Sequence, residues 1–281
     1  MSLLKAHLII RSNNTDHLDR MFVDIVSDLH VDYWKEHQYD WKEHAKSDTV
    51  IVAGDVSDYL EEVVVELKKA CEVYKDVLFV EGNHESSFCM NDMNHANMYI
   101  NSNMSDYKNF HNLTNKSFIK DNIAFIGVCG WWDFEICKPD VSKETGIGCF
   151  DTAWNTLTNL SKEDIVNNII ESANRDALNI KKRVNELKNS YNICLVIHTV
   201  PHKELISKEY PVNKDYRSHY GNSQIQSILE KEDSIKYVVF GHNHDACLQT
   251  SYLSKMLINN ARGRPKDYNR RQYYPLQICM N

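Results

Sequence analysis

The chain has 281 residues, of which 42% are hydrophobic and 25% charged, with a formal net charge of −7 at pH 7. This length and composition suit a globular protein with one α/β domain, and the negative charge makes long nucleic acid an unlikely partner. The eight cysteines form no CxxC pair, which argues against a disulfide frame or a thiolate zinc site and predicts a reduced, cytoplasmic protein. No apolar run reaches the roughly 20 residues that span a membrane, so we expect no membrane partner.

Two segments near the ends of the chain are open to interpretation. The polar stretch from Arg11 to Arg20 precedes Met21, where the first clear strand begins. Residues 1–20 are either a leader upstream of a natural start at Met21 or include an extra edge strand at Leu8–Arg11. Near the other end, a basic cluster is interpreted as a solvated loop, with a local binding patch as the alternative; it comprises Arg262, Arg264, Lys266, Arg270 and Arg271.

Residues 21–281 are predicted to form a single domain, because no repeat or low-complexity linker interrupts them. Apolar residues at helical spacing predict a helix over Tyr59–Tyr74, with Asp58 and Glu61 as its start signal. With the apolar runs on either side, this helix makes a βαβ unit, which favours parallel strands. Residues 86–116 are expected to form loops and a short helix. Further predictions are a strand at 123–128, helices near 163–188 and 223–230, and antiparallel strands at 251–258 and 273–279.

Five short apolar runs each end in polar residues of the same few types. These runs, with the residues that follow them, are Val23–Val26 before Asp28 and His30, Thr49–Ala53 before Asp55 and Asp58, Val77–Val80 before Asn83 and His84, Ile193–Ile197 before His198, and Tyr237–Phe240 before His242 and His244. The carboxyl ends of parallel strands converge on one crevice. The sequence therefore predicts a common cleft that collects these side chains.

The donor types in this cleft indicate metal ions. Carboxylate, amide and imidazole donors without thiolate suit Mn, Fe, Zn, Co or Ni. Seven such side chains are too many for one ion with an open position, but they suit two divalent ions bridged by Asp55; they are Asp28, His30, Asp55, Asn83, His198, His242 and His244. Two divalent ions less two carboxylates leave a charge of about +2, which favours an anionic substrate and a hydroxide formed from bound water, as in displacement at phosphorus.

Other residues are candidates for proton transfer and substrate contact. His84 follows Asn83 directly and is the candidate for protonating the leaving alkoxide, with Asp58 holding its other nitrogen. Both Asn83 and His84 are therefore expected to touch the substrate. His202 is a further possible substrate contact, with a surface histidine as the alternative. Asn222 stands at a helix start that could offer N–H groups to phosphate, with a plain helix cap as the alternative.

Taken together, the five motifs resemble the calcineurin-like metallophosphoesterase superfamily. The resemblance is carried by Asp28-x-His30, Gly54-Asp55-x-x-Asp58, Gly82-Asn83-His84-Glu85, His198 and Gly241-His242-Asn243-His244. It implies a four-layer αββα sandwich, an α/β fold with two mixed β-sheets flanked by helices. It also implies that His84 is the general acid paired with Asp58. One metal would be held by Asp28, His30, Asp55 and His244, and the other by Asp55, Asn83, His198 and His242.

Departures from the pattern narrow the subgroup. The protein Ser/Thr phosphatase branch carries arginines where this chain has Tyr59-Leu60 and Ser86-Ser87. Trp132-Asp133-Phe134 and His198-Thr199-Val200-Pro201 resemble a bacterial-type phosphoesterase subgroup instead. We therefore expect a metal-dependent hydrolase of a small phosphomonoester or phosphodiester. The alternatives are a nuclease or nucleotide pyrophosphatase, and a non-catalytic scaffold, against which the retention of every ligand weighs. The sequence predicts neither the identity of the metals nor the oligomeric state.

Overall fold

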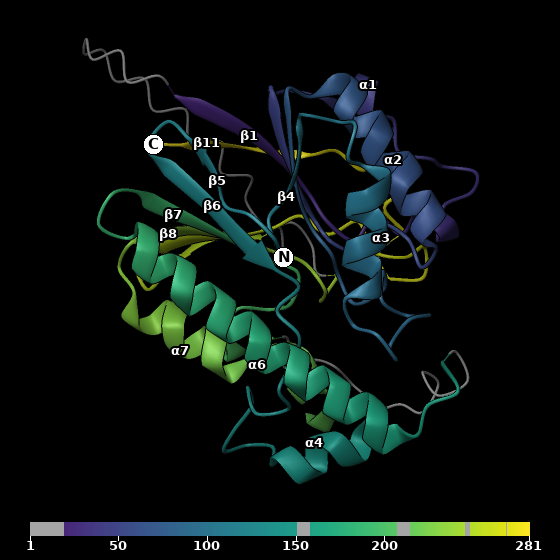
Figure 1. Cartoon of the computed structure of the whole chain (residues 1–281), viewed down its shortest axis with the longest axis vertical. Helices are drawn as coiled ribbons and strands as arrows, with labels where there is room; N and C mark the ends of the chain where they lie inside the picture. Colours follow the sequence, from purple (N-terminus) through teal and green to yellow (C-terminus); the bar gives the residue numbers. More distant parts are fainter. Residues whose placement is uncertain (1–19, 151–157, 207–213, 245–247, 268) are drawn as a thin grey trace, which may run out of the picture.

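The computed structural model describes residues 20–150, 158–206, 214–244, 248–267 and 269–281. Two β-sheets lie face to face, and helices cover the outer face of each sheet (Figure 1). This arrangement confirms the predicted four-layer αββα sandwich. The leader and the possible strand at Leu8–Arg11 lie outside the described residues.

The first sheet has five strands in the order β11-β1-β2-β3-β4. The strands are β1 (Met21–Val26), β2 (Thr49–Ala53), β3 (Asp76–Val80), β4 (Phe110–Asn112) and β11 (Leu276–Met280). Strands β1 to β4 pair in parallel, and β11 pairs antiparallel with β1. The parallel βαβ connection predicted from the sequence is thus confirmed.

The second sheet has six strands in the order β5-β6-β7-β8-β10-β9. The strands are β5 (Phe118–Lys120), β6 (Ile123–Val128), β7 (Asn192–Ile197), β8 (Ile235–Phe240), β9 (Leu248–Tyr252) and β10 (Lys255–Asn259). Strands β6, β7, β8 and β10 are parallel, while β5 and β9 pair antiparallel at the two edges. The predicted tail strands therefore separate: β9 and β10 join this sheet, and β11 joins the other.

Helices cover the outer faces of both sheets (Figure 1). The first sheet is covered by α1 (Trp41–His44), α2 (Leu60–Val73) and α3 (His95–Asn103), and the second by α6 (Lys162–Leu187) and α7 (Ser223–Lys231). Further helical segments in the described ranges include α4 (Lys143–Cys149), η1 (Val31–Tyr33), η2 (Lys203–Leu205) and η3 (Lys214–His219). No helix among the described residues is long and apolar enough to cross a membrane.

Alternate residues of each central strand enter different cores. Ile51 packs in the layer between the sheets together with Val196, whereas Val52 packs on the other side of β2 with Leu67 of α2. Leu195 likewise faces away from the first sheet into the core that α6 and α7 form over β7. Because both faces of each sheet are covered, the strands read as unbroken apolar runs. This burial fixes where each run ends, and so where its polar residues emerge.

The start of α2 differs from the prediction. Its N-cap is Tyr59, which makes no side-chain capping bond, and Asp58 contacts His84 instead. Ser57 supplies the local support, because its hydroxyl accepts a hydrogen bond from the Tyr59 N–H and donates one to Glu62. The carboxylate of Asp58 is therefore free to serve the site.

The basic cluster near the C-terminus is not a solvated loop throughout. Arg262 is only 1% exposed, and its guanidinium carbon lies 4.4 Å from the ring centroid of Trp34. This cation–π contact offsets part of the free-energy cost of burying the guanidinium. The loop prediction is thus wrong for Arg262, which is a core residue.

Candidate metal centre

The residues that follow the strands turn sharply out of the sheets. Several have a left-handed backbone, with φ of 50° at Asp28, 44° at His30, 54° at Asp55, 71° at His242 and 48° at His244. Asp and His tolerate this region better than most residues, but such backbones still cost energy and concentrate at functional sites. Each turn directs a side chain into the space at the carboxyl ends of the strands, as the sequence predicts.

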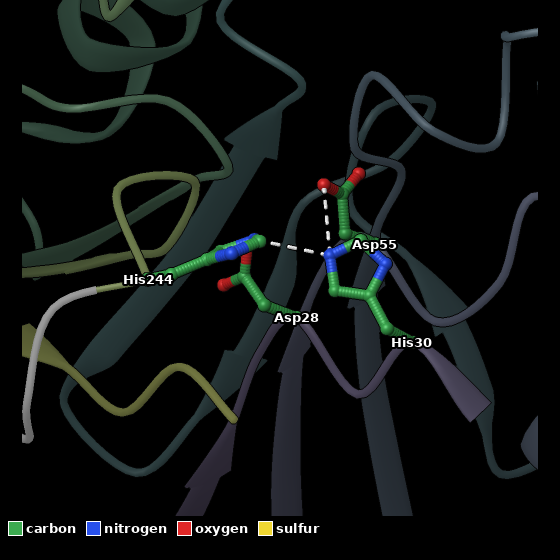
Figure 2. A group of neighbouring side chains, drawn as sticks. All are labelled: Asp28, His30, Asp55 and His244. Carbon is green, nitrogen blue, oxygen red and sulfur yellow. Dashed lines mark hydrogen bonds and ion pairs between the residues drawn. The ribbon is translucent and has the colours of Figure 1, made fainter. Parts of the chain in front are cut away.

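The first group of side chains joins the loops after β1, β2 and β8. Figure 2 shows the imidazoles of His30 and His244 pointing toward one another, with Asp28 and Asp55 beside them. Nε2 of His30 lies 3.0 Å from Nε2 of His244 and 3.8 Å from Oδ2 of Asp55. Nε2 of His244 lies 3.3 Å from Oδ1 of Asp28. One ligand atom from each of the four residues lies within 4.8 Å of the others.

The second group shares Asp55 with the first. One ligand atom each from Asp55, His198 and His242 lies within 4.8 Å of the others. Nε2 of His198 is 3.1 Å from Oδ2 of Asp55 and 3.1 Å from Oδ1 of Asn83. All seven residues predicted as ligands therefore lie in one region, and Asp55 lies between the two groups.

The hydrogen bonds on the outer sides of the histidines show that this region fits cations. Nδ1 of His198 lies 2.8 Å from the carbonyl oxygen of Ala53, and Nε2 of His242 lies 3.2 Å from that of His219. A nitrogen facing a carbonyl must carry the proton, which leaves the opposite nitrogen with its lone pair. The lone pair of His198 then faces two oxygen acceptors. Since acceptors cannot hydrogen-bond one another, a positive charge between them is required, and divalent ions meet this need.

The buried carboxylates create the same demand for positive charge. Asp28 and Asp55 are 0% and 1% exposed. Burial lowers the pKa of His198, but the Asp55 carboxylate outweighs it and raises this pKa to about 10. Burial likewise opposes protonation of His244, whose pKa is nevertheless raised to about 9 by hydrogen bonds to Asp267 and Asp28. Without a metal, protons on these imidazoles supply the charge that cations would otherwise provide.

His84 lies at the edge of the two groups. Its Nδ1 contacts Oδ1 of Asp58, and its backbone N–H donates to Oδ1 of Asp55 over 2.9 Å. Its Nε2 is 3.9 Å from Oδ2 of Asp55. Burial lowers the pKa of His84, but Asp55 and Asp58 outweigh this and raise it above the ordinary value. The arrangement keeps an imidazole oriented and readily protonated beside the cluster.

Glu85 is a residue whose part the sequence reasoning missed. Its carboxylate accepts hydrogen bonds from the backbone N–H groups of Asp55 over 3.0 Å, Val56 over 2.7 Å and Gly82 over 2.7 Å. It thereby ties the loop after β2 to the loop after β3. The sequence did contain a signal for Glu85, because this residue ends the third motif. Only the fold, however, shows which backbone N–H groups donate to its carboxylate.

Two residues of the C-terminal loop were also missed. Nη2 of Arg264 lies 2.7 Å from Nε2 of His84, and Oδ2 of Asp267 lies 2.6 Å from Nδ1 of His244. In the sequence, both look like ordinary charges of a polar loop. No local pattern could have joined them to motifs so far away in the chain.

The motif at Trp132-Asp133-Phe134 packs against the site residue His242 and is hydrogen-bonded to α7. The ring of Trp132 stacks on His242, with centroids 5.6 Å apart and an interplanar angle of 26°. Oδ2 of Asp133 accepts a hydrogen bond from the Ser223 N–H over 2.9 Å at the start of α7. The segment thus packs a predicted ligand against the second helical layer.

The two other proposed substrate contacts have structural partners instead. His202 is 4% exposed, so the expectation of a surface histidine is wrong; its Nε2 lies 3.1 Å from Glu230 Oε1. Asn222 caps α7 by accepting from the N–H groups of Gln224 and Ile225. With Ser223 bonded to Asp133, the first three N–H groups of α7 are all engaged. These contacts favour the helix cap and offer no support for phosphate binding at either residue.

Two mixed sheets between helical layers, with clustered Asp and His at the ends of their strands, define an α/β protein with a candidate metal site. Residues 21–246 match the family model described as calcineurin-like phosphoesterase, and the chain belongs to this family. Members use divalent metals and are hydrolases, which agrees with the donor set. The resemblance stated from the motifs is therefore confirmed.

The fold is shared with a solved structure. The chain is similar to the phosphopantetheinyl hydrolase from Mycobacterium tuberculosis, with a TM-score of 0.74 and 17% sequence identity, covering 93% of this chain and 96% of that one. It also matches a dimetal phosphatase from Danio rerio with a TM-score of 0.49 and 14% identity, covering 85% of this chain and 86% of that one. Among curated proteins, no significant match is found.

Proposed function

We propose that this protein is a metal-dependent phosphohydrolase that cleaves a small phosphomonoester or phosphodiester with two divalent ions. The observation that carries the proposal is the position of Asp55. Its carboxylate belongs to both groups of converging donors, and His84 lies beside it. A shared carboxylate is the arrangement that holds two ions close together for displacement at phosphorus.

Each ion has its own set of residues in this proposal. The first would be held by Asp28, His30, Asp55 and His244, and the second by Asp55, Asn83, His198 and His242. Oxygen and imidazole donors suit Mn, Fe, Zn, Co or Ni. When bound, the ions would neutralise the charge of the phosphoryl group and activate the attacking water.

The protein's own contribution is to deliver a proton to the leaving group. Asp58 contacts Nδ1 of His84 and so orients the ring with Nε2 toward the cluster. A protonated Nε2 can donate to the departing alkoxide oxygen, which would otherwise leave as a poor, strongly basic group. Asp58 stabilises the imidazolium form needed for this step. Asn83, which directly precedes His84 in the chain, would help to hold the second ion and would contact a phosphoryl oxygen.

The test uses purified protein loaded with Mn²⁺ and nitrophenyl mono- and diesters. His84→Ala is expected to lower kcat about 10²- to 10⁴-fold with unchanged metal content, because only the proton donor is lost. A matched control is His111→Ala, since His111 pairs with Asp76 at 3.3 Å near the amino end of β3. Absence of turnover of either ester by metal-loaded wild type would refute the hydrolase proposal. Loss of metal from His84→Ala would refute the assigned role of His84.

Two further substrates belong in the same assay. A phosphopantetheinyl ester is included because the similar structure from Mycobacterium tuberculosis is named as a hydrolase of that class. Single-stranded DNA tests the nuclease alternative, which the net charge of −7 disfavours. Turnover of one and not the others would identify the class of leaving group.

A further inference from the structure

We propose that Arg264 binds a phosphoryl oxygen of the substrate and makes the site prefer phosphomonoesters, which carry two negative charges, over diesters, which carry one. This inference rests on the proposed function and deepens it. Arg264 lies beyond residue 246, where the family match ends. It is also distinct from the ligands and from the His84–Asp58 pair.

The position of Arg264 places its guanidinium at the edge of the metal cluster. Nη2 lies 2.7 Å from Nε2 of His84, the nitrogen that faces the leaving group in the proposed reaction. On its other side the guanidinium carbon is 5.1 Å from the ring centroid of Tyr33. The side chain is half-buried between these two rings. A phosphoryl group that reaches His84 must therefore also come within reach of Arg264.

The guanidinium of Arg264 has no carboxylate in ion-pair contact within the described part of the chain, and its Nε is buried without a hydrogen-bond partner. Burial raises the pKa of Asp267, but its hydrogen bond with His244 and the charge of Arg264 outweigh this and lower it. Nε2 of His84 can accept a hydrogen bond from Arg264 only while the imidazole is neutral, so protonation of His84 for the proposed reaction removes this acceptor. The Tyr33 ring offers only a weak cation–π contact. A half-buried guanidinium with free donors is disposed to bind an anion, and its planar fork matches two oxygens of a phosphate.

Hydrogen bonds fix the backbone around Arg264 to the loops that carry the candidate metal ligands. The Gly263 N–H donates to the carbonyl of Asp28 over 3.0 Å, and the Trp34 indole donates to the carbonyl of Gly263 over 2.8 Å. The Arg264 N–H donates to Oδ2 of Asp267 over 2.8 Å, the same oxygen that faces His244. Gly263 has φ of +71°, and a Cβ there would lie 3.2 Å from Cβ of His244. The loop is thus held in place before any substrate arrives.

The number of charges explains the proposed preference. Two divalent ions less Asp28 and Asp55 leave an excess of about +2, and Arg264 raises it to about +3. A dianion gains more from this added charge than a monoanion does. A monoester also has three unesterified oxygens, so that one can reach the guanidinium while others face the ions. The segments after Asp55 and Asn83 offer no arginine, since Tyr59 and Ser86 stand there.

The test compares Arg264→Ala, Arg264→Lys and the control Lys266→Ala, in which an exposed cation of the same loop is removed. Inorganic phosphate is titrated into Mn²⁺-loaded protein by calorimetry. We expect the Kd to rise about ten- to a hundredfold in Arg264→Ala, less in Arg264→Lys, and not in Lys266→Ala. In parallel, kcat/KM is measured for nitrophenyl phosphate and bis(nitrophenyl) phosphate. The ratio of monoester to diester should fall at least tenfold in Arg264→Ala.

Either of two results would overturn the inference: an unchanged phosphate Kd in Arg264→Ala, or equal losses with the two esters. Metal content and thermal unfolding of each variant are measured first, so that a folding defect is recognised. If Arg264→Ala is misfolded, Arg264→Lys still tests the inference, because it keeps the positive charge and loses the planar guanidinium. If the wild type hydrolyses neither ester, the proposed function fails. The phosphate titration still shows whether Arg264 binds the anion.

Discussion

Nδ1 of His244 lies 2.6 Å from Oδ2 of Asp267, so a residue of the C-terminal loop orients an imidazole that follows β8. This contact keeps the proton on Nδ1 and turns Nε2 toward Asp28, 3.3 Å away. Carboxylate partners of this kind fix the tautomer of metal-binding histidines and increase their basicity. Asp267 is therefore expected to strengthen metal binding without touching the metal.

Replacing Asp267 should weaken metal binding. We expect Asp267→Ala to lower the affinity for Mn²⁺ about 10- to 100-fold, because His244 loses its orienting partner. Asp267→Asn keeps an acceptor without the charge and should have a smaller effect. Titration of metal-free protein with Mn²⁺ measures both, with Asp106→Ala as a control at an exposed position. Equal affinities in Asp267→Ala and wild type would show that the contact is incidental.

Metal binding should release protons. The pKa values of His198 and His244, about 10 and about 9, mean that both imidazoles hold two protons in metal-free protein at pH 7. A cation must displace the proton on Nε2 of each, so apparent affinity should fall as the pH is lowered. The expected slope is about one to two log units per pH unit. Calorimetry at pH 6, 7 and 8 in buffers of different ionisation enthalpy counts the protons. A pH-independent affinity would contradict this account.

Gly82 should tolerate no side chain. A Cβ there would lie 2.2 Å from Oδ1 of Asp55, well inside van der Waals contact. Gly82→Ala must therefore displace the carboxylate shared by the two groups, and we expect loss of at least one metal ion per chain. Gly148→Ala is the matched control, because nothing lies within 4 Å of the added Cβ. Metal analysis of the two purified variants decides; full metal content in Gly82→Ala would be the contrary result.

Asp176 should make stability depend on pH. It accepts hydrogen bonds from Gly130 N–H over 2.8 Å and Trp131 N–H over 3.2 Å, yet burial raises its pKa from 3.8 to about 6. Between these values the folded chain binds a proton that the unfolded chain lacks. Binding of this proton therefore stabilises the folded chain fully below pH 4, and this stabilisation is lost as the pH rises toward 6.

Asp176→Asn removes the titrating carboxyl group, so comparison with the wild type isolates its effect on stability. The free energy of unfolding of the wild type, minus that of the variant, should fall by about 2 kcal/mol between pH 4 and pH 6.5. Urea unfolding of metal-free protein at several pH values measures this difference. A difference that stays constant with pH would show that Asp176 is ionised throughout.

The strands and helices that position the site could be predicted from sequence because their signals are local. The run at 123–128 coincides with β6, and the helical pattern near 163–188 with α6 at Lys162–Leu187. An unbroken apolar run reports burial on both faces, and a 3.6-residue period reports burial on one. Neither signal depends on a distant part of the chain. The prediction that polar residues emerge at the ends of such runs follows for the same reason.

Pairing over long distances could not be predicted in this way. Asp58 and Glu61 have the spacing of a helix start, but a contact with His84 competes for Asp58 and prevails. The strands of the C-terminal tail have similar sequence patterns, yet β10 pairs with β8 while β11 pairs with β1. Which partner a strand or a carboxylate takes depends on the surface that the rest of the chain presents. Local spacing carries no record of that surface.

The sequence by itself determined the kinds of donor, their order and their place after each strand, because those follow from burial and strand ends. Only the tertiary structure brought Arg264 to His84, 180 residues earlier in the chain, and Asp267 to His244. A charged residue in a polar loop has the same local pattern whether it faces solvent or a metal cluster. The loop reaches the cluster because the Gly263 backbone is hydrogen-bonded to the turn after β1, and that contact exists only once both sheets have formed.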